Sequence, residues 1–130
     1  MSLLMFDASV PENAVAMWWL GQAGFAFKTP AGKVVLIDPY LSDAVERLFG
    51  FKRLSLPPID AEDVRADLVV LTHEHADHLD PDALPVIAGN NPACRFAAPA
   101  GCVEGLGEAG VDREALAILE ADRQYDLDGI

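Results

Sequence analysis

The three histidines of this chain, His73, His75 and His78, lie within six residues, and Asp77 lies among them. In an extended segment, residues i and i+2 point to the same side, so His73 and His75 can present their imidazoles to one divalent cation. Asp77 and His78 are adjacent, and a turn there can direct both side chains at a second cation. A bound divalent ion lowers the pKa of its water from about 15.7 to about 7. The cluster therefore predicts a metal site that could activate water.

The cluster directly follows the clearest strand in the sequence, which we expect over residues 67–72. Its centre is a run of four apolar residues, Leu-Val-Val-Leu, without polar alternation. Such a run indicates a strand buried on both faces, as in the middle of a sheet that helices cover. Ligand sites of α/β sheets lie beyond the carboxyl ends of strands. The strand is therefore expected to hold the histidine loop in place.

The segment before this strand predicts an antiparallel meander. We expect its strands over residues 15–20, 25–28 and 33–38, with a glycine-containing turn at 21–24 and a hairpin turn at 29–32. A short helix with Ser42 at its N-cap is expected next. One helical turn is expected at 60–64.

The segment after the histidine loop predicts alternating helices and strands. Asp80-Pro81-Asp82 is a helix-start signature, and this helix is expected to end near Gly89-Asn90. A strand at 95–98 and a helix at 99–109 follow, whereas residues 114–120 fit either a helix or a strand. This order is typical of βαβ units and of an α/β fold.

The motif His73-x-His75-x-Asp77-His78 after an apolar strand ending in Thr72 resembles the signature of the metallo-β-lactamase superfamily. Three further blocks are similar to its L-ascorbate-6-phosphate lactonase-like branch. They are Trp-Leu-Gly-Gln-Ala-Gly-Phe at 19–25, Ile-Asp-Pro-Tyr-Leu-Ser-Asp at 37–43 and Leu-Pro-Pro-Ile at 56–59. The resemblance implies an αββα sandwich, of which residues 1–130 would form a single domain equivalent to the N-terminal half.

The resemblance also implies a centre with two divalent ions, most often zinc or manganese. His73 and His75 would bind the first ion, and Asp77 and His78 would bind the second. Asp77 would also be the catalytic residue, because it would orient the bridging water or hydroxide. Asp38, at the end of its strand, would lie beneath the site and orient a ligand through a hydrogen bond, unless it is only a turn residue before proline.

The function that this resemblance implies is hydrolysis of a lactone or ester in a small molecule, phosphorylated or not, by metal-bound hydroxide. A phosphodiesterase or nuclease of the same superfamily is one alternative. A non-catalytic half-domain that binds metal weakly is another. A di-iron oxidoreductase is a third, but it usually has a carboxylate at the second histidine position, where this chain has His75.

The motif accounts for only part of such a centre. The superfamily supplies a further histidine, a bridging aspartate and a last histidine from a later half of the chain, and no histidine follows His78 here. We therefore expect this chain to be the N-terminal half of a longer domain. Half a sandwich would expose apolar sheet surface and an unpaired edge. We expect a homo-oligomer, or association with the missing half.

The composition indicates which partners the protein could bind and in which cellular compartment it would lie. The chain has 21 acidic and 9 basic residues and a net charge of −12, whereas binding to nucleic acid backbones requires clustered lysine and arginine. No apolar run approaches the roughly 20 residues of a membrane span. The two cysteines, Cys94 and Cys102, are expected to be buried apolar side chains. We expect a cytoplasmic domain without nucleic acid or membrane partners.

Overall fold

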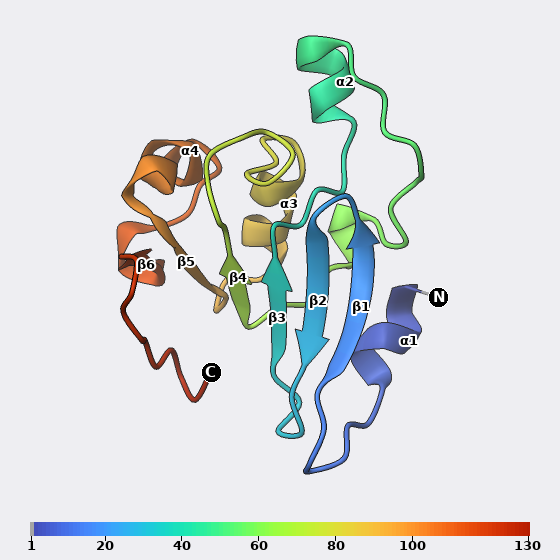
Figure 1. The fold of residues 1–130 in the computed structure, drawn as a ribbon, viewed down its shortest axis with the longest axis vertical. Coiled ribbons are helices and arrows are strands. Elements are labelled where there is room, and N and C mark those ends of the chain that lie inside the picture. The colour runs from blue at the N-terminus through green and yellow to red at the C-terminus, as the bar shows by residue number, and fades with distance from the viewer. Residues whose placement is uncertain (1) are drawn as a thin grey trace.

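The computed structural model describes residues 2–130, with side chains from residue 5 onward, and its centre is one sheet of six strands (Figure 1). The strands are β1 Ala16–Gly21, β2 Gly24–Lys28, β3 Val34–Ile37, β4 Leu68–Val70, β5 Arg95–Pro99 and β6 Leu116–Leu119. Their order in the sheet is their order in the chain. The pairs β1–β2 and β2–β3 are antiparallel, and the pairs from β3 to β6 are parallel. The α/β fold, with a meander followed by βαβ units, is confirmed.

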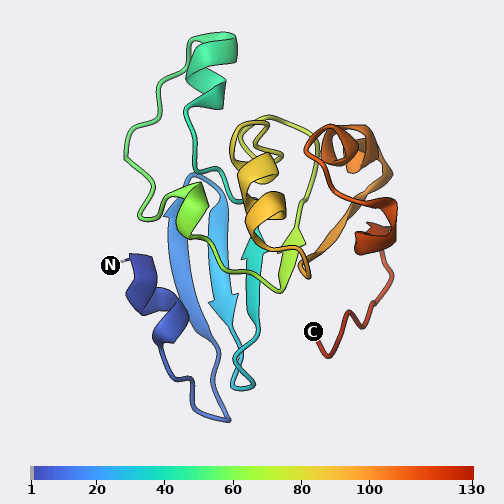
Figure 2. The same cartoon turned by 180° about the vertical axis from the view of Figure 1, so that it is seen from behind.

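Helices cover one face of this sheet. Three helices do so, α1 Ser2–Asp7, α3 Ala83–Asn90 and α4 Val103–Glu108, whereas α2 Ala44–Phe49 projects past the ends of the strands (Figure 1). The short 3-10 turns are η1 Ala61–Asp63, η2 Ala100–Cys102 and η3 Arg113–Ala115. Seen from behind, α1, η1, α3 and α4 lie in front of the strands (Figure 2). None of the described helices has the length and apolarity needed to cross a membrane.

The main core lies between these helices and the sheet. Leu36 and Val69 of the central strands pack there with Leu84 and Ile87 of α3 and with Leu106 of α4, and all five are at most 1% exposed. Burying one such side chain contributes about 1.5–3 kcal/mol. Because β3 and β4 are fixed from this side, the loops that leave their carboxyl ends start from rigid positions.

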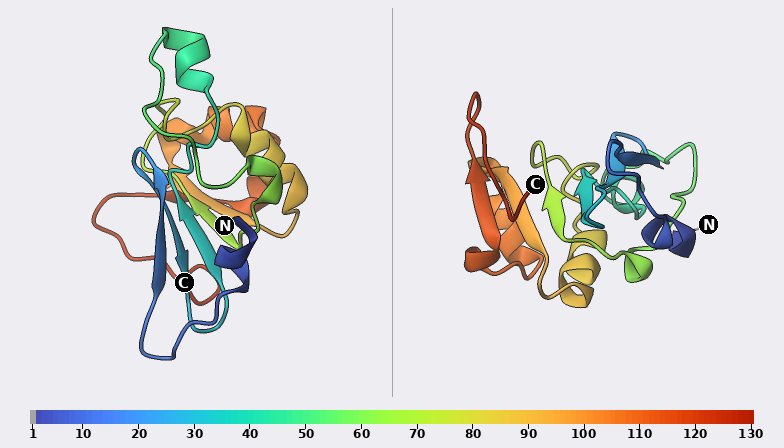
Figure 3. Two further views of the ribbon diagram at one scale, coloured as in Figure 1. Left: turned by 90° about the vertical axis from the view of Figure 1, so that its right-hand side faces the viewer. Right: turned by 90° about the horizontal axis from the view of Figure 1, so that it is seen from below.

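The opposite face of the sheet is also apolar but only partly covered. Val35, Leu68 and Ala97 form a small buried cluster there, and Leu127 and Ile130 of the C-terminal segment pack against it. That segment curls back along the sheet without crossing β1 (Figure 3). On β1, Met17 and Trp19 remain 61% and 60% exposed. Two successive outward positions of an edge strand are therefore large, apolar and uncovered.

Local details differ from the sequence-based expectations at several places. The strand expected over residues 67–72 is the shorter β4 Leu68–Val70. The helix expected after Ser42 begins at Ala44, with Asp43 at its N-cap position, and the Ser42 hydroxyl accepts the Ala44 amide instead. The helix expected at 99–109 is the turn η2 followed by the shorter α4. The ambiguous segment 114–120 divides between the turn η3 and the strand β6.

The turn between β1 and β2 brings the start of β2 close to the end of β3. A Cβ atom on Gly24 would lie 2.8 Å from the carbonyl oxygen of Asp38, so only glycine fits at this position. Gly24 therefore allows the chain to pass directly beside Asp38.

Candidate metal centre

Asp38 lies where β3 ends, in a left-handed backbone conformation that non-glycine residues seldom adopt, although aspartate tolerates it better than most. Its φ of 46° lies in the left-handed region, which costs roughly 1 kcal/mol or more for a residue with a Cβ atom. The carboxylate is 2% exposed. It accepts the Thr72 amide at 2.8 Å and the Thr72 hydroxyl at 2.7 Å, and one oxygen lies 2.9 Å from His78 Nδ1. The strained turn thus directs Asp38 at the loop that follows β4.

His73 and His75 project from this loop as a pair. His73 Nε2 lies 3.0 Å from His75 Nδ1, and the two ring centroids are 4.5 Å apart at an interplanar angle of 77°. Two nitrogen atoms that share a tetrahedral ion at about 2.0–2.1 Å lie roughly 3.3 Å apart. The two nitrogens are therefore near the separation that one shared cation requires.

Asp77 and His78 form a second pair beside the first. Asp77 Oδ2 lies 3.6 Å from His78 Nε2. The amides of His78 and Leu79 both donate to the carbonyl of His75, which closes the loop into a tight turn. The rings of His73 and His78 are 4.0 Å apart, so the two pairs adjoin.

The hydrogen bonds beneath the loop determine which ring nitrogens carry protons. The Asp38 carboxylate can only accept, so the Thr72 hydroxyl and His78 Nδ1 both donate to it. The Thr72 hydroxyl, having donated its one proton, accepts from His73 Nδ1 at 2.9 Å. In both rings Nδ1 is therefore the donor to the groups beneath the loop, and Nε2 faces the other member of its pair.

The described residues hold no group of three or more histidine, cysteine, aspartate or glutamate side chains arranged around a single ion. The donors come instead as two adjacent pairs. Imidazole and carboxylate donors fit Zn²⁺, Mn²⁺ or Fe²⁺, and each pair would need further ligands to complete a coordination sphere. The donor set thus fits part of a two-ion centre.

Asp80 connects this loop to the segment after β3. It is fully buried, and one oxygen accepts the amides of Leu41 and Ser42 at 2.9 and 3.0 Å. The other accepts the Ser42 hydroxyl at 2.7 Å and the amides of Asp82 and Ala83 at 3.0 Å. The sequence predicts its part at the start of α3 but not its bonds to residues 41 and 42. The segment after β3 and the loop after β4 are therefore held together at two points. One is the contact of Asp38 with Thr72 and His78, and the other is the set of bonds from Asp80 to residues 41 and 42.

Two further side chains lie near the loop. Glu74 is exposed, and its carboxylate lies close to Gly101 of η2. Cys102 is buried behind it, and burial, together with the negative charges of Glu74 and Asp38, raises the pKa of its thiol. Burial also raises the pKa of the Cys94 thiol, to about 12. Both thiols therefore stay protonated at neutral pH, as expected for apolar core residues.

Comparison with known proteins gives the family. The model of the β-lactamase superfamily domain matches residues 16–129. A protein of Polynucleobacter asymbioticus, named UPF0173 metal-dependent hydrolase, is 37% identical over 108 residues, which are 80% of this chain and 34% of that protein. An N-acyl-phosphatidylethanolamine-hydrolyzing phospholipase D of Caenorhabditis elegans is 32% identical over 77% of this chain and 29% of its own length. The chain thus spans about a third of these relatives.

The fold has a counterpart among solved structures. A metallo hydrolase of the archaeon Ignicoccus hospitalis superposes with a TM-score of 0.61 over 88% of this chain and 44% of that one, at 21% sequence identity. At this identity the similarity establishes the fold alone. The family match, which includes the whole sheet and the histidine loop, establishes descent. The chain belongs to the metallo-β-lactamase superfamily.

Proposed function

We propose that this chain carries part of the active site of a metal-dependent hydrolase. The observation that supports this most directly is the adjacency of the two donor pairs above one buried carboxylate. The names of the UPF0173 relatives, metal-dependent hydrolase, agree with it. When bound at such pairs, divalent ions supply a nucleophilic water at neutral pH and polarise the substrate oxygen.

The residues of the chain have separate parts in this proposal. His73 and His75 hold one ion through Nε2 and Nδ1, and Asp77 and His78 hold the second. Asp77 is also the catalytic residue, because its carboxylate would orient the attacking water. Asp38 and Thr72 keep the rings of His73 and His78 in the tautomers that leave Nε2 free. The Asp38 carboxylate also stabilises any positive charge that develops on His78.

The substrate class that we propose is a small molecule with a lactone or ester group. The resemblance to the L-ascorbate-6-phosphate lactonase-like branch supports this choice. The C. elegans relative favours a second candidate, phosphodiester hydrolysis, because its name describes a phospholipase D. A nuclease fits less well, since the net charge of −12 opposes binding of a polyanion. Zinc or manganese and a cytoplasmic location belong to the same proposal.

Metal content and hydrolysis, measured together, test this function. We expect the purified chain to bind zinc or manganese in a titration, with two ions per chain at saturation. We expect any turnover of lactone or phosphodiester substrates to disappear with a chelator and return with the metal. A chain that binds one ion weakly and hydrolyses neither substrate would instead be a metal-binding half-domain. A chain that binds no divalent ion would refute the proposal.

The partly covered face of the sheet leads to a separate prediction. Met17 and Trp19 are large and exposed, and Met17 is separated from Val35 of the apolar cluster only by Phe27 of β2. Exposed apolar surface of this kind favours association. We expect the chain alone to sediment as a dimer or larger species at micromolar concentration, and Trp19→Ser to shift it toward the monomer. A wild-type chain that sediments as a single monomeric species would contradict this.

A further inference from the structure

The end of α2 and the segment that follows it expose an unusual number of large apolar side chains. Five of them lie within residues 48–56, which we call the apolar lobe: Leu48, Phe49, Phe51, Leu54 and Leu56. Phe51 is 72% exposed and Leu54 is completely exposed, at 104%. The lobe projects past the ends of the strands, away from the sheet and its helices (Figure 1). Exposed apolar clusters of this kind mark interaction surfaces.

The lobe is held in this projecting position by specific contacts. Gly50, with φ of 79°, ends α2 and allows the chain to reverse. Arg53 points back toward the sheet, where its guanidinium donates to the carbonyls of Tyr40, Ser42 and Ser55 at 2.7–3.1 Å. Arg47 of α2 pairs with Asp82 at 2.6 Å. The hydrogen bonds of Arg53 and the ion pair of Arg47 thus hold the backbone of the lobe in the conformation that exposes its apolar side chains.

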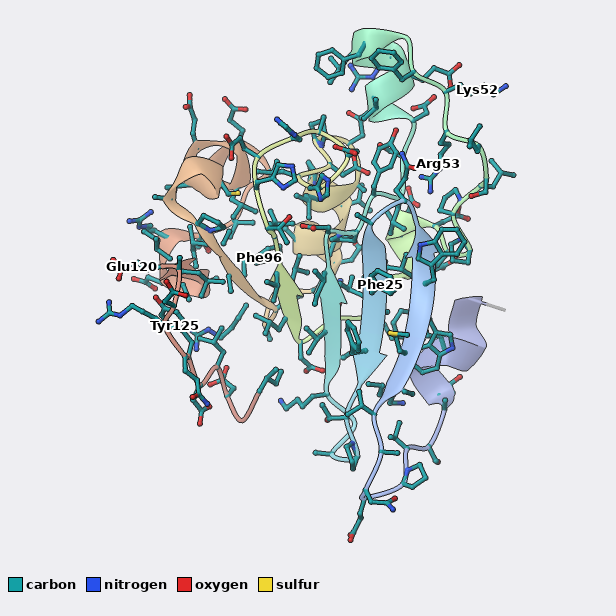
Figure 4. The ribbon with its side chains drawn as sticks, viewed as in Figure 1. Phe25, Lys52, Arg53, Phe96, Glu120 and Tyr125 are labelled. Atoms are coloured by element: carbon teal, nitrogen blue, oxygen red, sulfur yellow. The ribbon has the colours of Figure 1, made fainter. Side chains whose placement is uncertain are left out.

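The charge of the lobe is opposite to that of the rest of the chain. Its two charged residues are Lys52 and Arg53, and all 21 acidic residues lie outside it. Figure 4 shows Lys52 directed outward and Arg53 directed inward. The lobe itself therefore combines phenylalanine and leucine side chains with one outward ammonium group, and the neighbouring acids Asp43, Glu46 and Asp60 line the same hollow as Lys52.

We propose that the apolar lobe docks this protein onto the surface of a bilayer that contains anionic phospholipids. Phenylalanine and leucine side chains insert at the boundary between headgroups and acyl chains, and a nearby lysine is attracted to anionic headgroups. The acidic remainder of the chain is repelled by the same surface, but salt screens that repulsion beyond about 10 Å. A projecting lobe can therefore approach while the body stays away.

This mode of binding differs from the absence of a membrane partner expected from the sequence. That expectation depends on the lack of an apolar run of about 20 residues, which excludes a spanning helix. Five exposed side chains on a short lobe need no such run. The docking also does not depend on the proposed hydrolysis, and it can be tested on the metal-free chain.

Co-sedimentation with vesicles tests the docking. We expect the chain to bind phosphatidylcholine vesicles that contain phosphatidylserine, and to bind pure phosphatidylcholine more weakly. Phe51→Ser with Leu54→Ser should weaken binding about tenfold or more, because both side chains insert. Lys52→Glu should weaken binding only to the anionic vesicles, and added salt should do the same. The matched control, Val15→Ser with Ile118→Ser, removes two exposed apolar side chains outside the lobe and should bind like the wild type.

A fluorescent label locates the contact. Cys94 and Cys102 are buried, so a cysteine placed at Leu54 can be labelled selectively with an environment-sensitive dye. We expect its emission to shift to the blue on anionic vesicles, and the same dye on Val15→Cys to stay unchanged. Failure of the wild type to bind anionic vesicles would overturn the proposal, as would equal losses in the lobe variant and its control. If the lobe variant instead dissociates an oligomer, the lobe is a contact between copies and the proposal is wrong.

Discussion

The variant His75→Ala is expected to lose affinity for divalent metal by about 100-fold or more, which is larger than the tenfold to 100-fold effect typical of residues that only support a ligand. His75 Nδ1 is half of the donor pair with His73 Nε2, and the two atoms lie 3.0 Å apart. Alanine would leave one imidazole, which cannot hold an ion alone. Titration with Co²⁺, followed by its visible absorption, measures the loss directly and does not depend on activity.

Glu74→Gln is the matched control for this variant. Glu74 lies in the same loop and is exposed, its carboxylate lies close to Gly101, and it has no part in the two donor pairs described above. Its neutralisation removes one nearby negative charge, so affinity for Co²⁺ should fall by less than about threefold at moderate salt. Equal losses in the two variants would show that His75 acts only through the general charge of the loop, and its assignment as a ligand would be wrong.

The second large effect is expected from Asp80→Ala, which should lower the free energy of unfolding by about 4 kcal/mol. Its buried carboxylate accepts four backbone amides and one hydroxyl, from two separate parts of the chain, residues 41–42 and 82–83. Alanine would leave buried donors such as the Leu41 amide without partners, and each costs about 1–3 kcal/mol. The loss is a large fraction of the roughly 5–15 kcal/mol of a typical domain. Urea unfolding, followed by circular dichroism, measures it.

Two further variants distinguish this mechanism from a general effect of removing charge. Asp67→Ala removes a half-exposed carboxylate that accepts one amide, that of Val34, at 2.8 Å and lies 3.8 Å from Lys33. It should cost only about 1 kcal/mol. Asp80→Asn should cost an intermediate amount, because its amide group would face donors where the carboxylate had accepted them. If Asp67→Ala and Asp80→Ala lowered the free energy of unfolding by similar amounts, the proposed stabilisation by the buried hydrogen bonds of Asp80 would be wrong.

The elements that the sequence predicts correctly are those with local signals. The run of four apolar residues at 68–71 identifies the central strand β4, and the apolar segments flanking residues 29–32 identify a hairpin. Asp80 followed by proline marks the start of α3, where its side chain accepts the amides of residues 82 and 83. The spacing of the three histidines and Asp77 locates the loop in which these side chains meet, and their role as metal ligands stays a prediction. In each case neighbouring residues carry the whole signal.

The features that the sequence does not reveal depend on contacts between distant residues. Asp38 meets Thr72 and His78 across 34 and 40 positions, and Asp80 meets Leu41 across 39. No pattern of neighbouring residues predicts such bonds. The left-handed φ of Asp38 also cannot be predicted from the residues next to it. The apolar lobe resembles a core segment in sequence, because exposure is a property of the whole fold. The sequence thus indicates which residues could bind a metal or cap a helix, but it does not indicate which distant residues they contact.

The agreement between strand order in the sheet and strand order in the chain bears on how this molecule forms during synthesis. Each strand pairs with the one made just before it. The sheet can therefore grow from one edge as the polypeptide emerges from the ribosome, and no strand waits for a partner that has yet to be translated. The hairpins at the beginning would provide a template early, and short loop closures favour fast assembly. A nascent chain that has emerged through residue 78 would already contain Asp38, Thr72 and His78, which meet beneath the loop.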